Sequence, residues 1–375
     1  MLISGSRSAP LTWARVAALV MRLTQSLFQP DTVRLHCFVD DPIASIRGTP
    51  SDRKRCAAVM ILVWEALNFG LAYRKGQLSS RAVWIGGTLE FTASGIDAAI
   101  KESIVTDISD ALTRFEGTNV VSRKELLSFT SRANHAAGLL LTLRPFLQPL
   151  WAALSSANSG PTNTVWVKQI EHSLSWIRAL FKAQIPGSTR TFSLEQFRNA
   201  GPSLEIGTDA SPWGLGGWLA SSGVITHYFY SAVTQDDLDL YKIERGSCVG
   251  QQVLEGLAIL VALRLWHDPS NDRKAQIQVR GDNVGTLTLL IKMRPHTTHQ
   301  TIIARELALA VSDFSFPPKV VHTPCVAHKV ADGLSRMFDP NHQDKSILSH
   351  PALRHAQRTM TPDRPRSWHR ALDAR

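Results

Sequence analysis

Residues 204–232 read LEIGTDASPWGLGGWLASSGVITHYFYSA, and this stretch predicts three strands joined by short turns. We expect the strands at residues 204–209, 216–220 and 224–230. A long apolar helix over residues 249–266 follows, then a strand over residues 275–281. Two more helices, a strand at residues 319–322 and a final helix near residues 327–337 complete the domain. Three strands followed by alternating helices and strands predict a mixed α/β domain with a mixed five-stranded sheet and flanking helices.

Composition limits the class of protein. The 375 residues allow two or three domains, and 44% hydrophobic with 19% charged residues is typical of folded chains. The net charge of +10 favours a polyanionic partner, above all nucleic acid. No apolar stretch approaches the ~20 residues of a spanning helix, and no signal peptide is recognisable, so we expect no membrane partner. The four cysteines lie far apart without a CxxC pair, which disfavours a disulfide scaffold and a cysteine zinc site. We expect an intracellular protein of the nucleus or the cytoplasm.

Four single acids lie on consecutive elements of the α/β domain. Asp209 ends the first strand and Asp282 ends the fourth, each on the side of its strand that carries polar or small residues. Glu255 lies in a helix that is apolar almost all round, with no Lys or Arg at its i±3 or i±4 positions. A carboxylate there costs several kcal/mol unless it is protonated, paired or bound to a cation. Asp332, near the start of the last helix, is the fourth acid.

Such a set of acids suits two-metal phosphodiester hydrolysis, in which two Mg²⁺ ions ~4 Å apart activate a water and stabilise the leaving oxygen. Oxygen ligands suit Mg²⁺, with Mn²⁺ as the alternative ion. Each acid also has a structural interpretation. Asp209 could form an Asx-turn before Pro212, and Glu255 could be a neutral buried acid. Asp282 or Asp332 could cap a helix. Their order on strand, helix, strand and helix favours the metal site.

These residues resemble the type 1 ribonuclease H domain of retroelement polyproteins over roughly residues 203–338. The matching stretches are Thr208-Asp209-Ala210-Ser211, Gly214-Leu215-Gly216-Gly217-Trp218, Glu255-Gly256-Leu257-Ala258, Gly281-Asp282-Asn283 and Ala331-Asp332-Gly333-Leu334-Ser335-Arg336. The resemblance implies that Asp209, Glu255, Asp282 and Asp332 are the catalytic, metal-binding carboxylates. Many relatives carry a catalytic-assist histidine in a loop before the last acid. Here His328 lies only four residues before Asp332, so we expect a loop or cap residue, with proton transfer as the alternative.

Phe38-Val39-Asp40-Asp41 resembles the aromatic-x-Asp-Asp hairpin of reverse transcriptases, in which two adjacent carboxylates hold a metal against a nucleotide triphosphate. The segment Gly5-Ser6-Arg7-Ser8-Ala9-Pro10, which precedes a helix, resembles the element that contacts template and nucleotide. Arg74-Lys75-Gly76 and Val83-Trp84-Ile85-Gly86-Gly87 resemble the elements after the hairpin. The helical stretch around residues 139–151 resembles the connector of DIRS-like retroelements. A reverse transcriptase needs a further acid on an upstream palm strand, so we expect an N-terminally truncated fragment that does not polymerise alone.

The resulting interpretation is a retroelement reverse transcriptase/ribonuclease H fragment that cleaves the RNA strand of RNA–DNA hybrids with two Mg²⁺ ions. We expect a partial palm at residues 1–95, a helical thumb or connector at 96–200, the ribonuclease H-like domain at 201–340 and a mobile basic tail at 341–375. The expected metal ligands are Asp209, Glu255, Asp282, Asp332, Asp40 and Asp41. The expected nucleic-acid contacts are Arg7, Arg53, Lys54, Lys75, Asn283 and Arg336.

Two other interpretations remain open. The first is a non-catalytic nucleic-acid-binding relic of a retroelement, for which salt-sensitive association without metal dependence is expected. The second is another nuclease or integrase of the same fold superfamily. Another chain could supply the missing polymerase segment in the leading interpretation.

Overall fold

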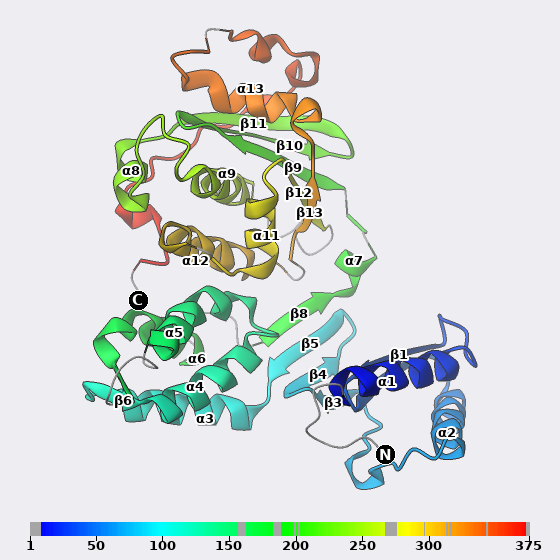
Figure 1. Cartoon of the computed structure of the whole chain (residues 1–375). Coiled ribbons are helices and arrows are strands. Elements are labelled where there is room, and N and C mark those ends of the chain that lie inside the picture. Colours follow the sequence, from blue (N-terminus) through cyan, green and yellow to red (C-terminus); the bar gives the residue numbers. More distant parts are fainter. Residues whose placement is uncertain are drawn as a thin grey trace. The chain divides into compact units, whose positions relative to one another are not determined.

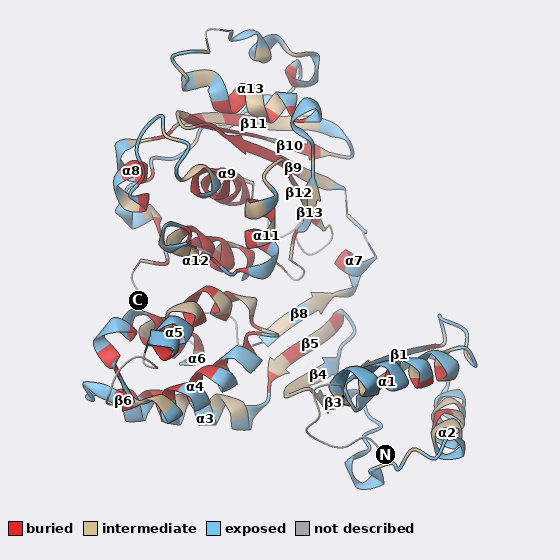
Figure 2. Ribbon diagram, in the orientation of Figure 1, coloured by how far each residue is buried: buried red, intermediate tan, exposed pale blue. Residues whose placement is uncertain are grey.

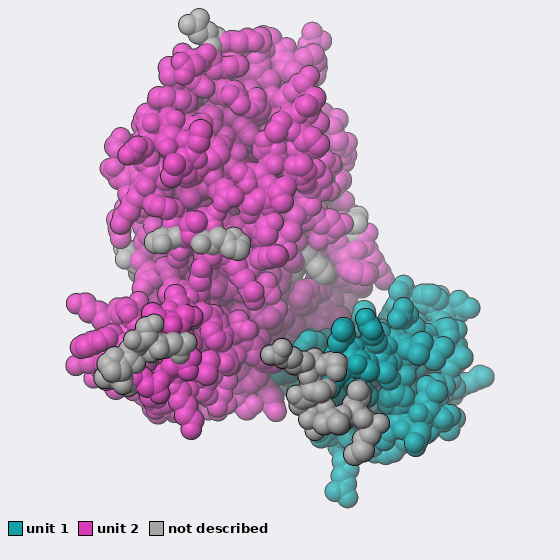
Figure 3. All heavy atoms as spheres, viewed as in Figure 1, with its two compact units in different colours: residues 1–89 teal, residues 90–375 magenta. Residues whose placement is uncertain are grey.

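The computed structural model describes residues 9–156, 163–182, 189–198, 200–201, 203–266, 276–295, 297–312, 314, 317–342 and 344–372. The chain divides into two compact units, residues 1–89 and residues 90–375 (Figure 3). The expected connector and the expected α/β domain therefore lie in one unit, where each has its own hydrophobic core. No helix in the described ranges is both long and apolar enough to cross a membrane.

The first unit is a small helix-and-hairpin assembly. Its elements are α1 (Ala9–Gln25), β1 (Val33–Phe38), β2 (Asp41–Ile46), α2 (Pro50–Ala66), η1 (Tyr73–Lys75) and β3 (Arg81–Trp84), and β4 (Gly87–Phe91) crosses the boundary between the units. Helix α1 packs on the antiparallel β1–β2 hairpin. Thr49 starts α2 with a capping box, in which its hydroxyl accepts from the Asp52 backbone N–H and Asp52 returns the bond.

The second unit begins with helices around an apolar core. Its elements are β5 (Gly95–Ile100), α3 (Glu102–Phe115), β6 (Val120–Ser122), α4 (Arg123–Ala136), η2 (Leu141–Leu143), α5 (Arg144–Ser156), β7 (Thr164–Trp166), η4 (Val167–Gln169), α6 (Glu171–Phe181), β8 (Thr189–Ser193) and α7 (Leu194–Phe197). Phe146 stacks on Trp176 at the centre of this core, with ring centroids 5.0 Å apart. Leu309 of the α/β domain joins the same core, so the two parts of the unit pack on one another.

The α/β domain is built on a six-stranded mixed sheet in the order β13-β12-β9-β10-β11-β14. The strands are β9 (Leu204–Ala210), β10 (Gly214–Ser221), β11 (Val224–Ala232), β12 (Ile277–Gly281), β13 (Lys319–His322) and β14 (Gln357–Arg358). The first three are antiparallel neighbours, whereas β12 runs parallel to both β9 and β13. The mixed α/β class expected from the sequence is confirmed. The sheet has one strand more than expected, because β14 pairs with the edge strand β11.

Helices cover both faces of this sheet. They are α8 (Gln235–Tyr241), α9 (Gln251–Leu265), α11 (Val284–Lys292), α12 (Thr298–Ser312) and α13 (Lys329–Ser335). Helix α9 packs on β9 and β10 from one side and α13 packs on them from the other (Figure 1). Every residue from Val253 to Leu263 is buried, so α9 is the central helix of the domain (Figure 2). An apolar circumference is typical of a helix enclosed on all sides.

The expectation of a mobile C-terminal tail is wrong for residues 344–372. This segment forms η7 (Ser346–Ser349), η8 (Pro351–Leu353), β14 and η9 (Arg366–Trp368). Arg364 is buried, with its guanidinium 2.8 Å from Asp237 Oδ2. It also donates to the Ser231 hydroxyl and the Ala232 carbonyl. The acid that pairs with Arg364 lies 127 residues earlier in the chain. A charge count over the tail alone does not include this acid, and it therefore predicts disorder.

The buried His369 makes the docking of this segment sensitive to pH. Burial, and then the positive charge of Arg264, lower the pKa of His369 to about 4. The unfolded chain takes up a proton near pH 6.5 that the folded chain does not, so the free energy of unfolding falls as pH drops from about 6.5 to 4. We expect His369→Phe to weaken this dependence in thermal unfolding scans. The exposed His355→Phe should leave it unchanged, and equal slopes in both variants would exclude the buried histidine as the cause.

Candidate metal centre

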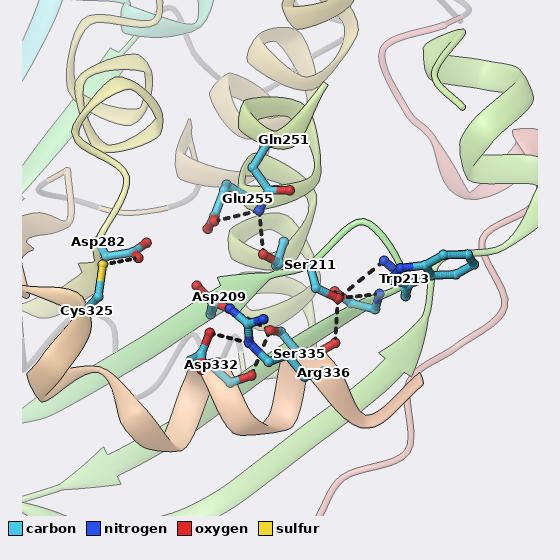
Figure 4. Close-up of polar contacts among 12 residues, drawn as sticks. Asp209, Ser211, Trp213, Gln251, Glu255, Asp282, Cys325, Asp332, Ser335 and Arg336 are labelled. Atoms are coloured by element: carbon cyan, nitrogen blue, oxygen red, sulfur yellow. Dashed lines mark hydrogen bonds and ion pairs between the residues drawn. The ribbon is translucent and has the colours of Figure 1, made fainter. Parts of the chain in front are cut away.

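Three carboxylates meet at one edge of the sheet. Strands β9 and β12 are parallel neighbours, so Asp209 near the end of β9 and Asp282 just after β12 come to the same edge. Helix α9 crosses β9 and brings Glu255 to the same place. One oxygen from each of the three side chains lies within 4.8 Å of the other two. Figure 4 shows the three acids with the residues around them.

Burial makes this group of acids electrostatically unfavourable. The side chains of Asp209 and Glu255 are buried, each with 5% exposure. Burial raises the pKa of Asp209 to about 7, the Ser335 hydroxyl opposes this rise, and the nearby Asp282 and Asp332 add to it. Burial, followed by the charges of Asp209 and Asp282, raises the pKa of Glu255 well above its usual range. A cation between these groups would offset both the burial and the mutual repulsion.

The donors fit a hard divalent cation. All three side chains offer carboxylate oxygens, which Mg²⁺ and Mn²⁺ prefer. Glu255 accepts a hydrogen bond from Gln251 Nε2 at 3.2 Å. Because this amide donor is neutral, it leaves the negative charge of Glu255 uncompensated. No Lys or Arg of the described residues forms an ion pair with any of the three acids. The residues present therefore suit an acid-bound metal ion.

Asp332 lies beside the three acids and is not a member of the close group. It comes from α13, on the opposite face of the sheet from α9. Its Oδ1 is 2.7 Å from Arg336 Nε one turn further along, with both side chains over 40% exposed. Its carboxylate still contributes to the raised pKa of Asp209. The structure thus brings three of the four expected acids together and places the fourth next to them in an ion pair.

Small residues allow α13 to approach the sheet closely. A Cβ atom on Gly216 of β10 would lie 2.4 Å from the backbone nitrogen of Ser335, and one on Gly214 would lie 2.5 Å from its carbonyl oxygen. The close approach lets Ser335 Oγ donate to Asp209 Oδ2 at 2.5 Å. The two glycines of the sequence motif therefore set the distance between α13 and the first acid.

Further contacts at the site were not predicted from the sequence. Gln251 holds Glu255 from one turn earlier and also donates to the carbonyl of Ala210 at 2.5 Å. Gln251 lies four residues before Glu255 on the same helix, and this spacing is a sign of the contact that the sequence contains. Cys325 Sγ donates to Asp282 Oδ2 at 3.2 Å, and this bond raises the pKa of the thiol. Cys325 lies 43 positions after Asp282, and a separation of that length leaves no such signal.

Two residues near the acids have structural positions. His328 is buried, and its Nε2 lies 2.8 Å from the carbonyl oxygen of Thr208. It thereby ties the start of α13 to β9. Asn283 caps α11, since its side-chain oxygen accepts from the backbone N–H of Thr286 at 3.1 Å. This cap fixes the chain direction immediately after Asp282.

The expected sites of the first unit lie on its surface. Asp40 and Asp41 are exposed at the turn of the β1–β2 hairpin, where Trp84 Nε1 donates to the Asp41 carbonyl at 2.9 Å. No third acid or histidine joins them in the part of the chain that the structure describes. Arg53 and Lys54 are exposed on α2, and Lys75 is exposed in η1. Arg7, in the segment 5–8, lies outside the described residues.

No known protein family profile matches this chain, and no curated protein sequence matches it. Three similar solved structures are forms of a foamy viral protease-reverse transcriptase. The dRH form in complex with double-stranded DNA has a TM-score of 0.36 at 14% identity, over 84% of this chain and 49% of that one. The complex with an RNA/DNA hybrid has a TM-score of 0.38 at 15% identity, over 86% of this chain and 39% of that one. The complex with double-stranded DNA has a TM-score of 0.40 at 14% identity, over 86% of this chain and 59% of that one. The chain thus spans between two fifths and three fifths of these proteins, and with this low overall likeness the functional conclusion depends on the carboxylate site.

Proposed function

We propose that the α/β domain hydrolyses phosphodiester bonds in the RNA strand of RNA–DNA hybrids, using divalent metal ions held by its carboxylates. The observation that carries this proposal is the convergence of Asp209, Glu255 and Asp282 within 4.8 Å at a sheet edge. Asp332 lies beside them and would complete a second site. Two Mg²⁺ ions, when bound, supply an activated water and stabilise the leaving oxygen.

The chain's own residues orient these ligands. Gln251 fixes the Glu255 carboxylate and Ser335 fixes one oxygen of Asp209, which leaves the remaining oxygens for the ions. Asp209 has a pKa of about 7, so its carboxyl is partly protonated at neutral pH. Cations bind ionised carboxylates, and binding therefore releases a proton from this site.

Nucleic acid is the proposed partner because the chain carries a net charge of +10. We assign phosphate contacts to Arg7, Arg53, Lys54, Lys75, Asn283 and Arg336. Recognition of a hybrid would use backbone shape and 2′-hydroxyl groups, with no reading of base sequence. The first unit is proposed as part of a reverse transcriptase palm. Its Asp40 and Asp41 would bind metal only together with a third acid from a further polymerase segment.

The test is cleavage of a hybrid with an end label on either strand by the purified full chain. In Mg²⁺ we expect cuts in the RNA strand only, and none in EDTA. Cleavage of both strands would indicate a less selective nuclease of the same fold. Salt-sensitive binding without cleavage in Mg²⁺ or Mn²⁺, by a chain shown to be folded, would leave a binding relic. The Asp332–Arg336 ion pair favours the binding relic, because Arg336 occupies the carboxylate that would complete the second metal site.

Ser335→Ala tests the orientation of Asp209. The hydroxyl lowers the pKa of Asp209, so its removal raises that pKa further. At limiting Mg²⁺ we expect the pH dependence of cleavage to move to higher pH, because more base is needed to ionise Asp209. The measurement is the cleavage rate between pH 6 and 9. The exposed Ser349→Ala is the matched control, and an unmoved profile in Ser335→Ala would show that the serine does not act on Asp209.

A further inference from the structure

The ion pair between Asp332 and Arg336 lies directly beside the metal centre. Arg336 Nε donates to Asp332 Oδ1 at 2.7 Å. The residue between them and the sheet is Ser335, whose Oγ lies 2.9 Å from the carbonyl oxygen of Asp332 and donates to Asp209 Oδ2 (Figure 4). Ser335 therefore links the backbone that carries the ion pair to the first acid of the centre.

The guanidinium of Arg336 has donors to spare. Among the described residues, its side chain makes one hydrogen bond, through Nε to Asp332, and both Nη groups remain for another acceptor. The two side chains are 44% and 42% exposed. An exposed i,i+4 pair contributes little stability, so a second anion can displace it. A planar guanidinium with free Nη groups matches the oxygens of a phosphate.

A buried ion pair of the same domain shows the contrast. Arg364 is held by Asp237, by the Ser231 hydroxyl and by the Ala232 carbonyl, with the side chains of the pair almost fully buried. That pair can only be structural. The Asp332–Arg336 pair has one bond and lies open to solvent, so its partners can be exchanged.

The ion pair weakens the second metal position in the free chain. A cation held by Asp332 beside Asp209 must displace the guanidinium or lie next to its positive charge, and both are unfavourable. The position between Asp209, Glu255 and Asp282 has no such competitor among the described residues. The two metal positions therefore differ: the first is ready for an ion, and the second is opposed by an arginine.

We propose that Arg336 controls the second metal position. It holds Asp332 in the free chain and passes to a backbone phosphate when nucleic acid binds, which frees Asp332 for the ion. This inference rests on the proposed function for the metal and for the choice of a nucleic acid. Binding of nucleic acid and binding at the second position are coupled, and each strengthens the other.

The first experiment measures binding of Mn²⁺ to the purified full chain by isothermal titration calorimetry, without nucleic acid. We expect Arg336→Gln to tighten the second Mn²⁺ position about tenfold, because a positive charge is removed from beside a divalent ion. Arg336→Lys keeps the charge and should behave as wild type. The exposed Arg354→Gln is the matched control. Adding Asp332→Asn to Arg336→Gln should abolish the gain.

The possible failures of this titration are distinguishable. A first Mn²⁺ position that binds, with an unchanged second position in Arg336→Gln, overturns the proposal and leaves the metal centre intact. Absence of Mn²⁺ binding in every chain refutes the metal centre and the control by Arg336 together. Because the titration requires no cleavage, a tighter second position in a chain that never cleaves upholds the role of Arg336 and refutes only the proposed hydrolysis.

The second experiment tests the exchange of Arg336 between carboxylate and phosphate. Binding of a fluorescein-labelled RNA–DNA hybrid is measured by anisotropy in EDTA. Asp332→Asn removes the competitor for the guanidinium, so we expect it to tighten binding about threefold more in the chain with Arg336 than in Arg336→Gln. The exposed Glu244→Gln should have the same effect in both backgrounds. An equal effect of Asp332→Asn in both backgrounds would mean that Arg336 does not pass to a phosphate, and would overturn the exchange.

Discussion

Glu255→Gln is expected to lower metal-dependent cleavage of an RNA–DNA hybrid by about a thousandfold. Metal ions contribute several kcal/mol of transition-state stabilisation, and about 4 kcal/mol corresponds to that factor. The amide has the shape of the carboxylate and retains the hydrogen bond with Gln251, yet it is a poor ligand for a cation. Asp282→Asn should have an effect of similar size for the same reason.

The same substitution should stabilise the protein in the absence of metal. Glu255 is buried beside Asp209 and Asp282, and its charge is unfavourable there. In EDTA, Glu255→Gln should therefore unfold at a higher temperature than wild type, whereas added Mg²⁺ should stabilise only the wild type. The exposed Glu244→Gln is the matched control and should behave as wild type in both assays. Lower stability in EDTA would mean that Glu255 has a structural partner, and the metal centre would be refuted.

Arg364→Ala should lower the free energy of unfolding by about 3–5 kcal/mol, because it leaves the buried carboxylate of Asp237 without its partner. Urea unfolding of the full chain measures this loss. Arg366→Ala removes an exposed arginine two residues away and should cost less than about 1 kcal/mol.

A double variant separates the charge from the contact. Asp237→Asn keeps the hydrogen bond by which Asp237 caps α8 and removes the buried charge. Combined with Arg364→Met, it should recover most of the lost stability, since replacing both charges of a buried pair is often nearly neutral. A loss below about 1 kcal/mol in Arg364→Ala alone would show that the segment after α13 does not anchor the domain.

The α/β class followed from the sequence because its signals are local. The strands over residues 204–232 and the apolar helix around Glu255 can each be recognised within a short window. Glu255 was also identifiable as a functional candidate, since its surroundings offered no cation. The convergence of Asp209, Glu255 and Asp282 depends on strands β9 and β12 being neighbours, which only the structure provides.

The remaining features depend on contacts between distant residues. Ser335 reaches Asp209 across 126 positions, and Arg364 reaches Asp237 across 127. No periodicity or composition records such pairs, so the sequence predicts a mobile tail where the structure has an ordered C-terminal segment. The ion pair between Asp332 and Arg336 is different. Its i,i+4 spacing is present in the sequence, whereas the resemblance to a metal-binding family predicts a metal ligand at Asp332.

The distance along the chain between Asp237 and Arg364 also affects synthesis. Asp237 leaves the ribosome first, and 127 residues must follow before its partner exists. At 5–20 residues per second this takes about 6 to 25 s. During that interval the edge strand β11 lacks β14, and the domain waits with an open sheet edge and a carboxylate that has no counter-charge. A chain whose synthesis stops before Arg364 would therefore expose this sheet edge to chaperones and proteases, and the domain would mature only after Arg364 has been added.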